Sequence, residues 1–315
     1  MADPLKIDSH VHIYETREIG RAEKTGYEVW EYGELAGVRA SALDGTVDEL
    51  LESMTSAGIS RAVIVNLYTT DEIRSQAVTR LEPGLTMSMR EKAIAEIEAR
   101  MTDEMRQFNL WACGVGHQHP ELAIFIATDP LLAPDEAGAA LVSELHESHG
   151  AHGVKLHGPA QGCMMSDRRL WATYGACEER GMPIIAHAGP DRQGIGYSDP
   201  PAFVDMLRDF PRLKVVVAHL GGASWRQTLE VADAFPNAYF DCCEIIDWTG
   251  SPNGPSEMEL ARLIREIGTQ RVMMGSDYPW YDLDNTVDRV MDLPLLSMEE
   301  KEGILGANAQ SILGL

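Results

Sequence analysis

Basic residues are scarce in this chain of 315 residues. It contains 26 lysines and arginines against 49 aspartates and glutamates, which gives a formal net charge of −23 at pH 7 with neutral histidines. Such an acidic surface repels phosphate backbones and anionic headgroups, so a nucleic-acid or membrane partner is not expected. The expected partner is a small-molecule substrate, and an anionic substrate would need local positive charge to overcome this field.

Cysteines and long apolar runs are also few. No run approaches the roughly 18 apolar residues of a membrane span, and the opening Met-Ala-Asp-Pro has no basic or apolar signal region. We therefore expect a cytoplasmic protein. The adjacent Cys242 and Cys243 point to opposite faces of an extended strand, which favours strand filling over a nucleophile. Without CxxC spacing, the five cysteines indicate neither a disulfide framework nor a thiolate zinc site: Cys113, Cys163, Cys177, Cys242 and Cys243.

Short apolar runs alternate with amphipathic stretches along the whole chain. Several runs, such as Val63-Ile64-Val65, are continuously apolar, which is typical of parallel strands buried on both faces. Eight strands, each followed by a helix, predict a (β/α)8 TIM barrel that forms a single domain over residues 1–315. A doubly wound sheet is the main rival, but no GxGxxG follows the first strand. The predicted strands are Leu5–Ile13, Arg61–Tyr68, Leu122–Asp129, Gly153–His157, Pro183–His187, Lys214–Leu220, Ala238–Glu244 and Arg271–Tyr278.

Capping boxes mark the beginnings of three helices. In each, a serine or threonine stands three residues before a glutamate, so that side chain and backbone can cap each other. Gly58 and Gly268 are the expected stops of the first two helices. The three boxes are Thr46 with Glu49, Ser256 with Glu259, and Ser297 with Glu300.

Two segments are too long for a minimal βα repeat. Residues 14–45 follow the first strand, and residues 69–119 follow the second and contain a long helical pattern over Met89–Asn109. Both insertions belong at the carboxyl end of the barrel, where active sites lie. We predict that they form a lid over the mouth. Packing decoration or an oligomer contact is the alternative.

Histidines and an aspartate stand at the ends of several predicted strands. His10 and His12 lie two apart on the first strand and therefore face the same way. His187, His219 and Asp277 follow at steps of about one βα unit, with the seventh strand skipped. One such histidine alone would be read as a hydrogen-bonded core residue. Together, the five predict a site for a divalent first-row metal inside the barrel mouth.

These motifs resemble those of the metal-dependent amidohydrolase superfamily. The likeness is to the amidohydrolase-2 branch that contains aminocarboxymuconate-semialdehyde decarboxylase and its relatives, and it covers the chain from residue 7 to residue 309. The family includes hydrolases, decarboxylases and a hydratase. The matching segments are Ile-Asp-Ser-His-Val-His at 7–12, Gly-Val-Lys-Leu-His-Gly-Pro-Ala-Gln-Gly at 153–162, His-Ala-Gly at 187–189, Ala-His-Leu-Gly-Gly at 218–222, Gly-Ser-Asp-Tyr-Pro at 275–279 and Ile-Leu-Gly-Ala-Asn-Ala at 304–309.

The resemblance implies a role for each matched residue. His10, His12 and His187 would be metal ligands, and Asp277 would be a ligand or the catalytic base. His219 would hydrogen-bond the metal-bound water or polarise the substrate carbonyl. Zinc is the expected metal, with manganese or iron as alternatives, because histidine and carboxylate ligands suit all three. The family also makes a homo-oligomer, a dimer or larger, the expected assembly.

Lys155 departs from the decarboxylase pattern, which usually has no lysine on the fourth strand. Lys155 and His157 lie two apart and should both face inward, where a lone ammonium is costly. Three interpretations remain open for the lysine. It binds a substrate carboxylate or phosphate, it is carbamylated and bridges two metals as in binuclear members of the superfamily, or it pairs with Glu244 or another inward acid. His157 is compatible with either metal arrangement.

Weaker candidates surround this set. Arg192 and Glu244 are candidate substrate contacts, as is Tyr278, which together with Trp280 and Tyr281 could form an aromatic wall. For each of them a packing or solvated role is at least as plausible. Nothing in the sequence selects among three arginines of the second insertion that could reach the site: Arg74, Arg80 and Arg90.

The sequence leaves two reactions in competition. The main interpretation is a metal-dependent hydrolase of a small, anionic amide, lactone or ester, with Asp277 moving the proton and His219 steadying the oxyanion. The alternative is a non-oxidative decarboxylase of an aromatic or dienoic acid that uses the same metal. Lys155 favours the hydrolase. A hydratase and a barrel that binds without turnover are minor alternatives, and the latter conflicts with the five intact site residues.

Overall fold

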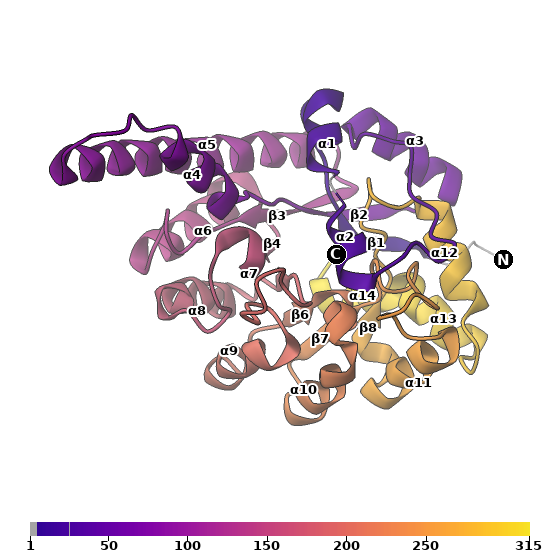
Figure 1. The fold of residues 1–315 in the computed structure, drawn as a ribbon. Helices are drawn as coiled ribbons and strands as arrows, with labels where there is room; N and C mark the ends of the chain where they lie inside the picture. The colour runs from indigo at the N-terminus through magenta and orange to yellow at the C-terminus, as the bar shows by residue number, and fades with distance from the viewer. Residues whose placement is uncertain (1–4, 25) are drawn as a thin grey trace.

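Eight parallel strands form the centre of the molecule, which is described by a computed structural model covering residues 5–24 and 26–315 (Figure 1). Each strand pairs with the next in sequence order from β1 to β8. The backbone of Ser9 donates to Met274 at 2.9 Å, and Val11 bridges Tyr278, so β1 also meets the segment of β8. The predicted TIM barrel is confirmed. Its strands are β1 Ile7–Val11, β2 Arg61–Val65, β3 Leu122–Ala127, β4 Gly153–Leu156, β5 Ile184–Ala186, β6 Val215–Val217, β7 Ala238–Asp241 and β8 Val272–Met273.

All eight strands fall inside the predicted runs but are shorter than them. Several polar residues near the ends of these runs, such as His187 and Asp277, lie beyond the strands and line the mouth instead. Two apolar clusters are buried by this arrangement. One fills the floor of the barrel around Phe125 and Met273, closed by α14, and the larger one lies between the strands and the surrounding helices.

Helices surround the barrel, and three of them begin after the predicted capping residues Thr46, Ser256 and Ser297. Gly58 ends the first of these in a left-handed conformation. The α-helices are α1 Arg17–Glu23, α2 Tyr27–Tyr32, α3 Val47–Ala57, α4 Thr70–Thr79, α5 Met87–Gln118, α6 Glu136–His149, α7 Gly158–Gln161, α8 Trp171–Arg180, α9 Val204–Asp209, α10 Thr228–Ala234, α11 Glu257–Ile267, α12 Leu283–Asp292, α13 Met298–Glu302 and α14 Asn308–Leu313. The short 3₁₀ segments are η1 Arg168–Leu170, η2 Pro200–Phe203, η3 Ala218–Gln227 and η4 Thr269–Arg271, and η5 Gly303–Ala307 is a π-helix.

The two insertions contain α1 with α2 and α4 with α5. In Figure 1, α4 and α5 lie side by side and extend away from the barrel. Helix α5 has 32 residues, longer than the predicted pattern, because its buried side continues through Cys113 and Val115 onto β3. In the part of the chain that the structure describes, no helix combines the length and the apolar character needed to cross a membrane.

Candidate metal centre and active site

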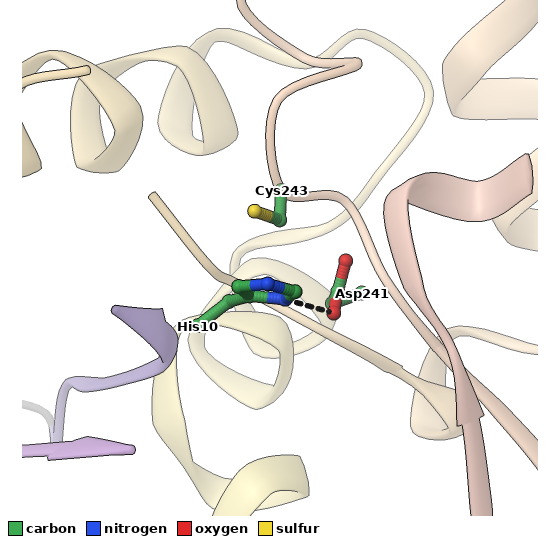
Figure 2. Close-up of side chains that lie close together, drawn as sticks. All are labelled: His10, Asp241 and Cys243. Atoms are coloured by element: carbon green, nitrogen blue, oxygen red, sulfur yellow. Dashed lines mark hydrogen bonds and ion pairs between the residues drawn. The ribbon is translucent and has the colours of Figure 1, made fainter. Parts of the chain in front are cut away.

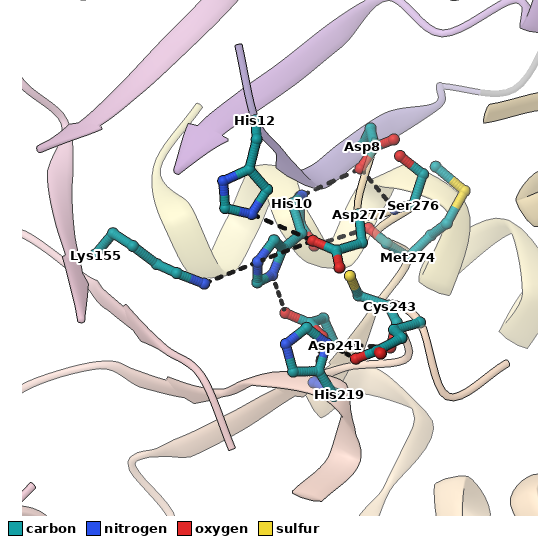
Figure 3. A network of polar contacts seen from close by, with 12 residues as sticks. Asp8, His10, His12, Lys155, His219, Asp241, Cys243, Met274, Ser276 and Asp277 are labelled. Atoms are coloured by element: carbon teal, nitrogen blue, oxygen red, sulfur yellow. Dashed lines mark hydrogen bonds and ion pairs between the residues drawn. The ribbon is translucent and has the colours of Figure 1, made fainter. Parts of the chain in front are cut away.

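A cavity of about 290 Å³ opens at the carboxyl ends of the strands. Most of the residues predicted to form the site reach it. The cavity is lined by eight of them, namely His10, His12, Lys155, His157, His187, His219, Glu244 and Asp277. Figure 3 shows the polar network at its base, where side chains from β1, β4 and the segments after β6, β7 and β8 converge.

A β-bulge in β1 turns His10 and His12 into the barrel. Ile7 pairs with Arg61 and Asp8 with Ala62, but Val11 pairs with Ile64, one residue short of the regular register. The extra residue reverses the alternation, so Ile7 packs in the barrel floor while Val11 packs outward against the helices. His10 and His12 then share the inward face, as their spacing predicts.

Asp277 lies against both histidines. Its Oδ1 is 3.2 Å from Nε2 of His12 and 3.7 Å from Nε2 of His10. Burial raises the pKa of Asp277, but the hydrogen bond from His12 and the nearby imidazoles outweigh it and hold the pKa below its ordinary value. The backbone at Asp277 has a φ of +59°, a left-handed conformation that aspartate tolerates. The side chain is therefore an ionised acceptor placed between two imidazoles.

Asp241 on β7 fixes the ring of His10 and was not predicted. Its Oδ2 lies 3.1 Å from Nδ1 of His10, and its Oδ1 accepts the backbone N–H of His219 at 2.7 Å. With the proton on Nδ1, the lone pair of His10 sits on Nε2 and faces the cavity. Sequence reasoning skipped the seventh strand, although Asp241 follows Tyr239 at the strand period and is an acid inside an apolar run.

Lys155 contacts His10 rather than an acid. Its Nζ lies 2.8 Å from Nε2 of His10 and its side chain is fully buried. Among the described residues no carboxylate lies within 4.0 Å of Nζ, so the ion pair with Glu244, one of the three interpretations open from the sequence, is not formed. Burial lowers the pKa of Lys155, which weakens its hold on a proton. Because Nε2 has one lone pair, Lys155 and a metal ion cannot both bind it.

His187 and His157 form a stacked pair. Their ring centroids are 3.9 Å apart and the planes differ by 5°. Nε2 of His187 is buried and has no hydrogen-bond partner in the described part of the protein. Burial lowers the pKa of both imidazoles, so they are neutral near pH 7. An unpaired buried nitrogen is costly unless a ligand fills it, which makes His187 a further donor toward the cavity.

The tautomer of His219 follows from its neighbours. Nδ1 lies 3.3 Å from the carbonyl oxygen of Cys243 and 3.6 Å from Oε2 of Glu244, and both are acceptors. Burial and the nearby His10 lower the pKa of His219 to about 4, so the ring is neutral and carries its proton on Nδ1. Its Nε2 is then an acceptor. This arrangement favours a hydrogen bond from water over polarisation of a carbonyl, which would need a donor.

Within residues 5–24 and 26–315, two groups of donors are close enough to hold one metal ion. The first is His10, His12 and Asp277. Ligands of one zinc ion lie roughly 3.3 Å apart, and the separations of 3.2 and 3.7 Å fit that spacing. These residues fit a divalent metal, provided that Lys155 leaves His10. His187, the third expected histidine ligand, lines the same cavity with an unpaired Nε2 but does not belong to this group of donors within 4.8 Å of one another.

The second group is His10, Asp241 and Cys243 (Figure 2). It suits a metal less well, because Asp241 already accepts hydrogen bonds from His10 and from the backbone of His219. Burial also raises the pKa of the Cys243 thiol well above its ordinary value, whereas a metal ligand must be a thiolate. The first group is therefore the candidate metal centre.

Several weaker candidates do not reach the cavity. Arg192 is exposed, stacks on Tyr27 at 5.0 Å and donates to the carbonyl of Gly26 at 3.2 Å. Tyr278 is fully buried outside the cavity lining, and its carbonyl accepts from the backbone of His12. Trp280 alone of the predicted aromatic wall lines the cavity, with its ring 5.2 Å from that of His12. None of the three arginines named in the second insertion lines it.

Side chains of both insertions line the cavity. Tyr14, Tyr27 and Glu28 come from the first insertion, and Asp71 and Phe108 come from the second. Tyr27 donates to the carbonyl of Pro190 at 2.6 Å, which ties α2 to the segment after β5. The insertions thus contribute to the site, and their action as a lid stays a prediction.

The chain matches the model of a known family over residues 7–315, a family described as Amidohydrolase. The chain belongs to the amidohydrolase family. No curated protein matches this amidohydrolase by sequence. As a family member it is an enzyme with hydrolase or carboxy-lyase activity, and the family together with the histidine and aspartate donors supports a divalent metal at the site.

Solved structures share the fold of this amidohydrolase at low identity. An uncharacterized TIM-barrel protein of Bordetella bronchiseptica has a TM-score of 0.70 and 20% identity, covering 98% of both chains. A dihydroxybenzoic acid decarboxylase of Polaromonas, with bound manganese and an inhibitor, has a TM-score of 0.69 and 16% identity over 99% and 97% of the chains. A putative 2-pyrone-4,6-dicarboxylic acid hydrolase of Pseudomonas putida has a TM-score of 0.60 and 16% identity over 98% and 97%.

The contact between Lys155 and His10 predicts how metal binding responds to a substitution. Lys155→Met should bind one zinc ion per chain about tenfold more tightly than the unchanged protein, because the ammonium no longer occupies Nε2 or repels the ion. Metal content by elemental analysis and the zinc Kd by competition with a chelator measure this. Two equivalents in the unchanged protein, falling to one or none in the variant, would instead establish a carbamylated lysine that bridges two metals.

Proposed function

We propose that this amidohydrolase is a mononuclear, zinc-dependent hydrolase of a small amide, lactone or ester. The placement of Asp277 carries the proposal. Its carboxylate is ionised, contacts both His10 and His12, and lines the cavity. A carboxylate beside the metal donors can serve as the base that hydrolysis requires.

The side chains of the cavity have separate tasks in this reaction. A bound divalent metal supplies a Lewis acid that polarises the substrate carbonyl and acidifies water. His10 and His12 hold it through Nε2, with His187 as a further donor, and Asp241 keeps the proton of His10 on Nδ1. Asp277 takes the proton from the attacking water and returns it to the leaving group.

His219 orients the water in this scheme. Its Nε2 accepts a hydrogen bond, since Nδ1 donates to the Cys243 carbonyl. Among the described residues, the only lysine of the cavity is bonded to His10 and no arginine lines it, so a substrate carboxylate would have the metal as its only cationic partner.

The proposal also includes zinc as the metal, a homo-oligomeric assembly and a cytoplasmic location. Zinc suits the nitrogen and carboxylate donors, and manganese is the alternative, since it is bound in the decarboxylase from Polaromonas. We retain a homo-oligomer and a cytoplasmic location. Apolar side chains exposed on the first insertion, including Val29, Trp30 and Leu35, support a contact between copies. The two insertions would close the mouth as a lid.

Isotope labelling of the products tests the reaction class. The zinc-loaded enzyme is incubated with panels of esters, lactones, amides and aromatic or dienoic acids. In H₂¹⁸O a hydrolase places ¹⁸O in the new carboxylate, which mass spectrometry detects. In D₂O a decarboxylase places deuterium on carbon and releases carbon dioxide. Deuterium on carbon without ¹⁸O incorporation would replace our proposal with the carboxy-lyase alternative.

A further inference from the structure

The lining of the active-site cavity is strongly acidic. One lysine and no arginine line it within the described residues, and Lys155 is buried against His10. Four of the carboxylates that line it come from the two insertions, on α1, α2 and α4. Six carboxylate residues face this space: Glu23, Glu28, Asp71, Glu72, Glu244 and Asp277. Such a lining attracts a cationic group and repels an anionic one.

Glu244 is a buried carboxylate that lines this cavity. Only 3% of its surface is exposed, it lines the cavity, and no hydrogen bond to its carboxylate is formed by the described residues. The nearest donor, Nδ1 of His219, is 3.6 Å away and donates to the carbonyl of Cys243. Its backbone adopts a left-handed φ of +62° to place this side chain. Burial and the neighbouring carboxylates raise the pKa of Glu244, so its charged form requires a cationic partner in the cavity.

Aromatic rings accompany the carboxylates. Tyr14, Tyr27, Phe108 and Trp280 line the same cavity. A ring face attracts a cation, and the attraction increases when water is excluded. Glu28 is half-buried on α2, next to Tyr27 in the chain, so a carboxylate and a ring are presented together. This combination is suited to an organic cation that is flat or partly apolar.

A second inorganic ion accounts for these carboxylates less well. Neither Glu28 nor Glu244 belongs to a group of three donors within 4.8 Å of one another, among the residues that the structure describes. The carboxylates surround the cavity without converging on one point.

We propose that the substrate carries an ammonium or guanidinium group, which Glu244, from the segment after β7, and Glu28, from α2, bind in this cavity. The inference rests on the proposed function for the reacting carbonyl. It replaces the anionic substrate expected from the sequence, because the two cations expected to bind an anion do not serve that purpose. Lys155 contacts His10, and Arg192 lies outside the cavity lining.

Matched probes test this preference without turnover. We would measure the Kd of the zinc-loaded enzyme for 2-phenylethylguanidinium, its neutral isostere 2-phenylethylurea and the anion 2-phenylethanesulfonate by calorimetry. The guanidinium should bind about tenfold more tightly than the urea, and the sulfonate should bind weakest. Sulfonate binding as tight as that of the guanidinium would overturn the proposal.

Isosteric variants locate the cation site. Glu244→Gln and Glu28→Gln should each weaken guanidinium binding about tenfold and leave urea binding within twofold. Glu28 lies on the insertion, so its variant serves if the buried Glu244→Gln does not fold. Glu179→Gln, at an exposed position of α8, is the matched control and should change neither constant. A guanidinium preference that survives both variants would reject the assignment to these residues.

The outcomes separate the two proposals. Selective guanidinium binding without hydrolysis of any cationic ester, lactone or amide would reject the proposed reaction and retain the cation site. Hydrolysis of neutral or anionic substrates, with no preference among the probes, would retain the reaction and reject the cation site.

Discussion

Asp277→Asn should lower kcat by about three orders of magnitude, within the range that loss of a general acid–base gives. Asparagine keeps an oxygen at this position, but the amide cannot accept a proton or supply the negative charge that a cationic metal requires. Asparagine also tolerates the left-handed backbone at this position, so the fold should not change. Turnover of the best substrate from the labelling panel and metal content are measured together.

The control for Asp277→Asn is Asp103→Asn, an exposed position on α5, which should retain full activity. Unfolding in denaturant shows whether both variants are folded. If Asp277→Asn keeps its metal and works within tenfold of the unchanged enzyme, Asp277 is not the base. His219, whose Nε2 is an acceptor, would then be the next residue to test.

Asp241→Asn should lower both metal affinity and activity by about 10- to 100-fold, although Asp241 touches neither metal nor substrate. Its two oxygens accept from His10 Nδ1 and from the backbone of His219. Asparagine can keep only one of these acceptors. If its oxygen stays on the backbone N–H, its amide donates to Nδ1 of His10 and moves the ring proton to Nε2. That proton then occupies the position through which His10 would bind the metal.

The tautomer of His10 distinguishes this positioning role from simple destabilisation. Nitrogen NMR of histidine-labelled protein should show Nδ1–H at His10 in the unchanged protein and Nε2–H in Asp241→Asn. Asp8→Asn is the matched control. Asp8 is equally buried and accepts the backbone N–H groups of His10 and Ser276 through one oxygen, which asparagine retains. Loss of metal affinity with an unchanged tautomer would contradict the mechanism.

The architecture could be predicted from the sequence because its signals are local. Parallel strands appear as continuous apolar runs, and capping residues three apart fix the beginnings of α3, α11 and α13. The helical period marked α5 but ended too early, because its last two turns are held by packing on β3. The histidines and Asp277 could be singled out because polar residues at the strand ends recur at intervals of about one βα unit.

What surrounds those residues could not be predicted. Spacing shows that His10 and His12 share a face, but only the bulge between Asp8 and Val11 determines that this face is the interior. The partner of Lys155 is set by contacts between distant strands, and it is His10 instead of Glu244. The strand period indicates that Asp241 faces inward, but it does not show that the residue beside it is His10, which belongs to a distant part of the chain.

The sequence by itself therefore determined the barrel, its family and the candidate metal-binding side chains, since each depends on short-range pattern. The tertiary structure decided which ring nitrogen faces the cavity, which residue holds it there and what charge the cavity presents. These depend on atoms from β1, β4, β7 and the segments after β6 and β8, which approach within about 3 Å of one another in pairs (Figure 3). In a closed barrel, a one-residue change of register moves every such atom to the opposite face.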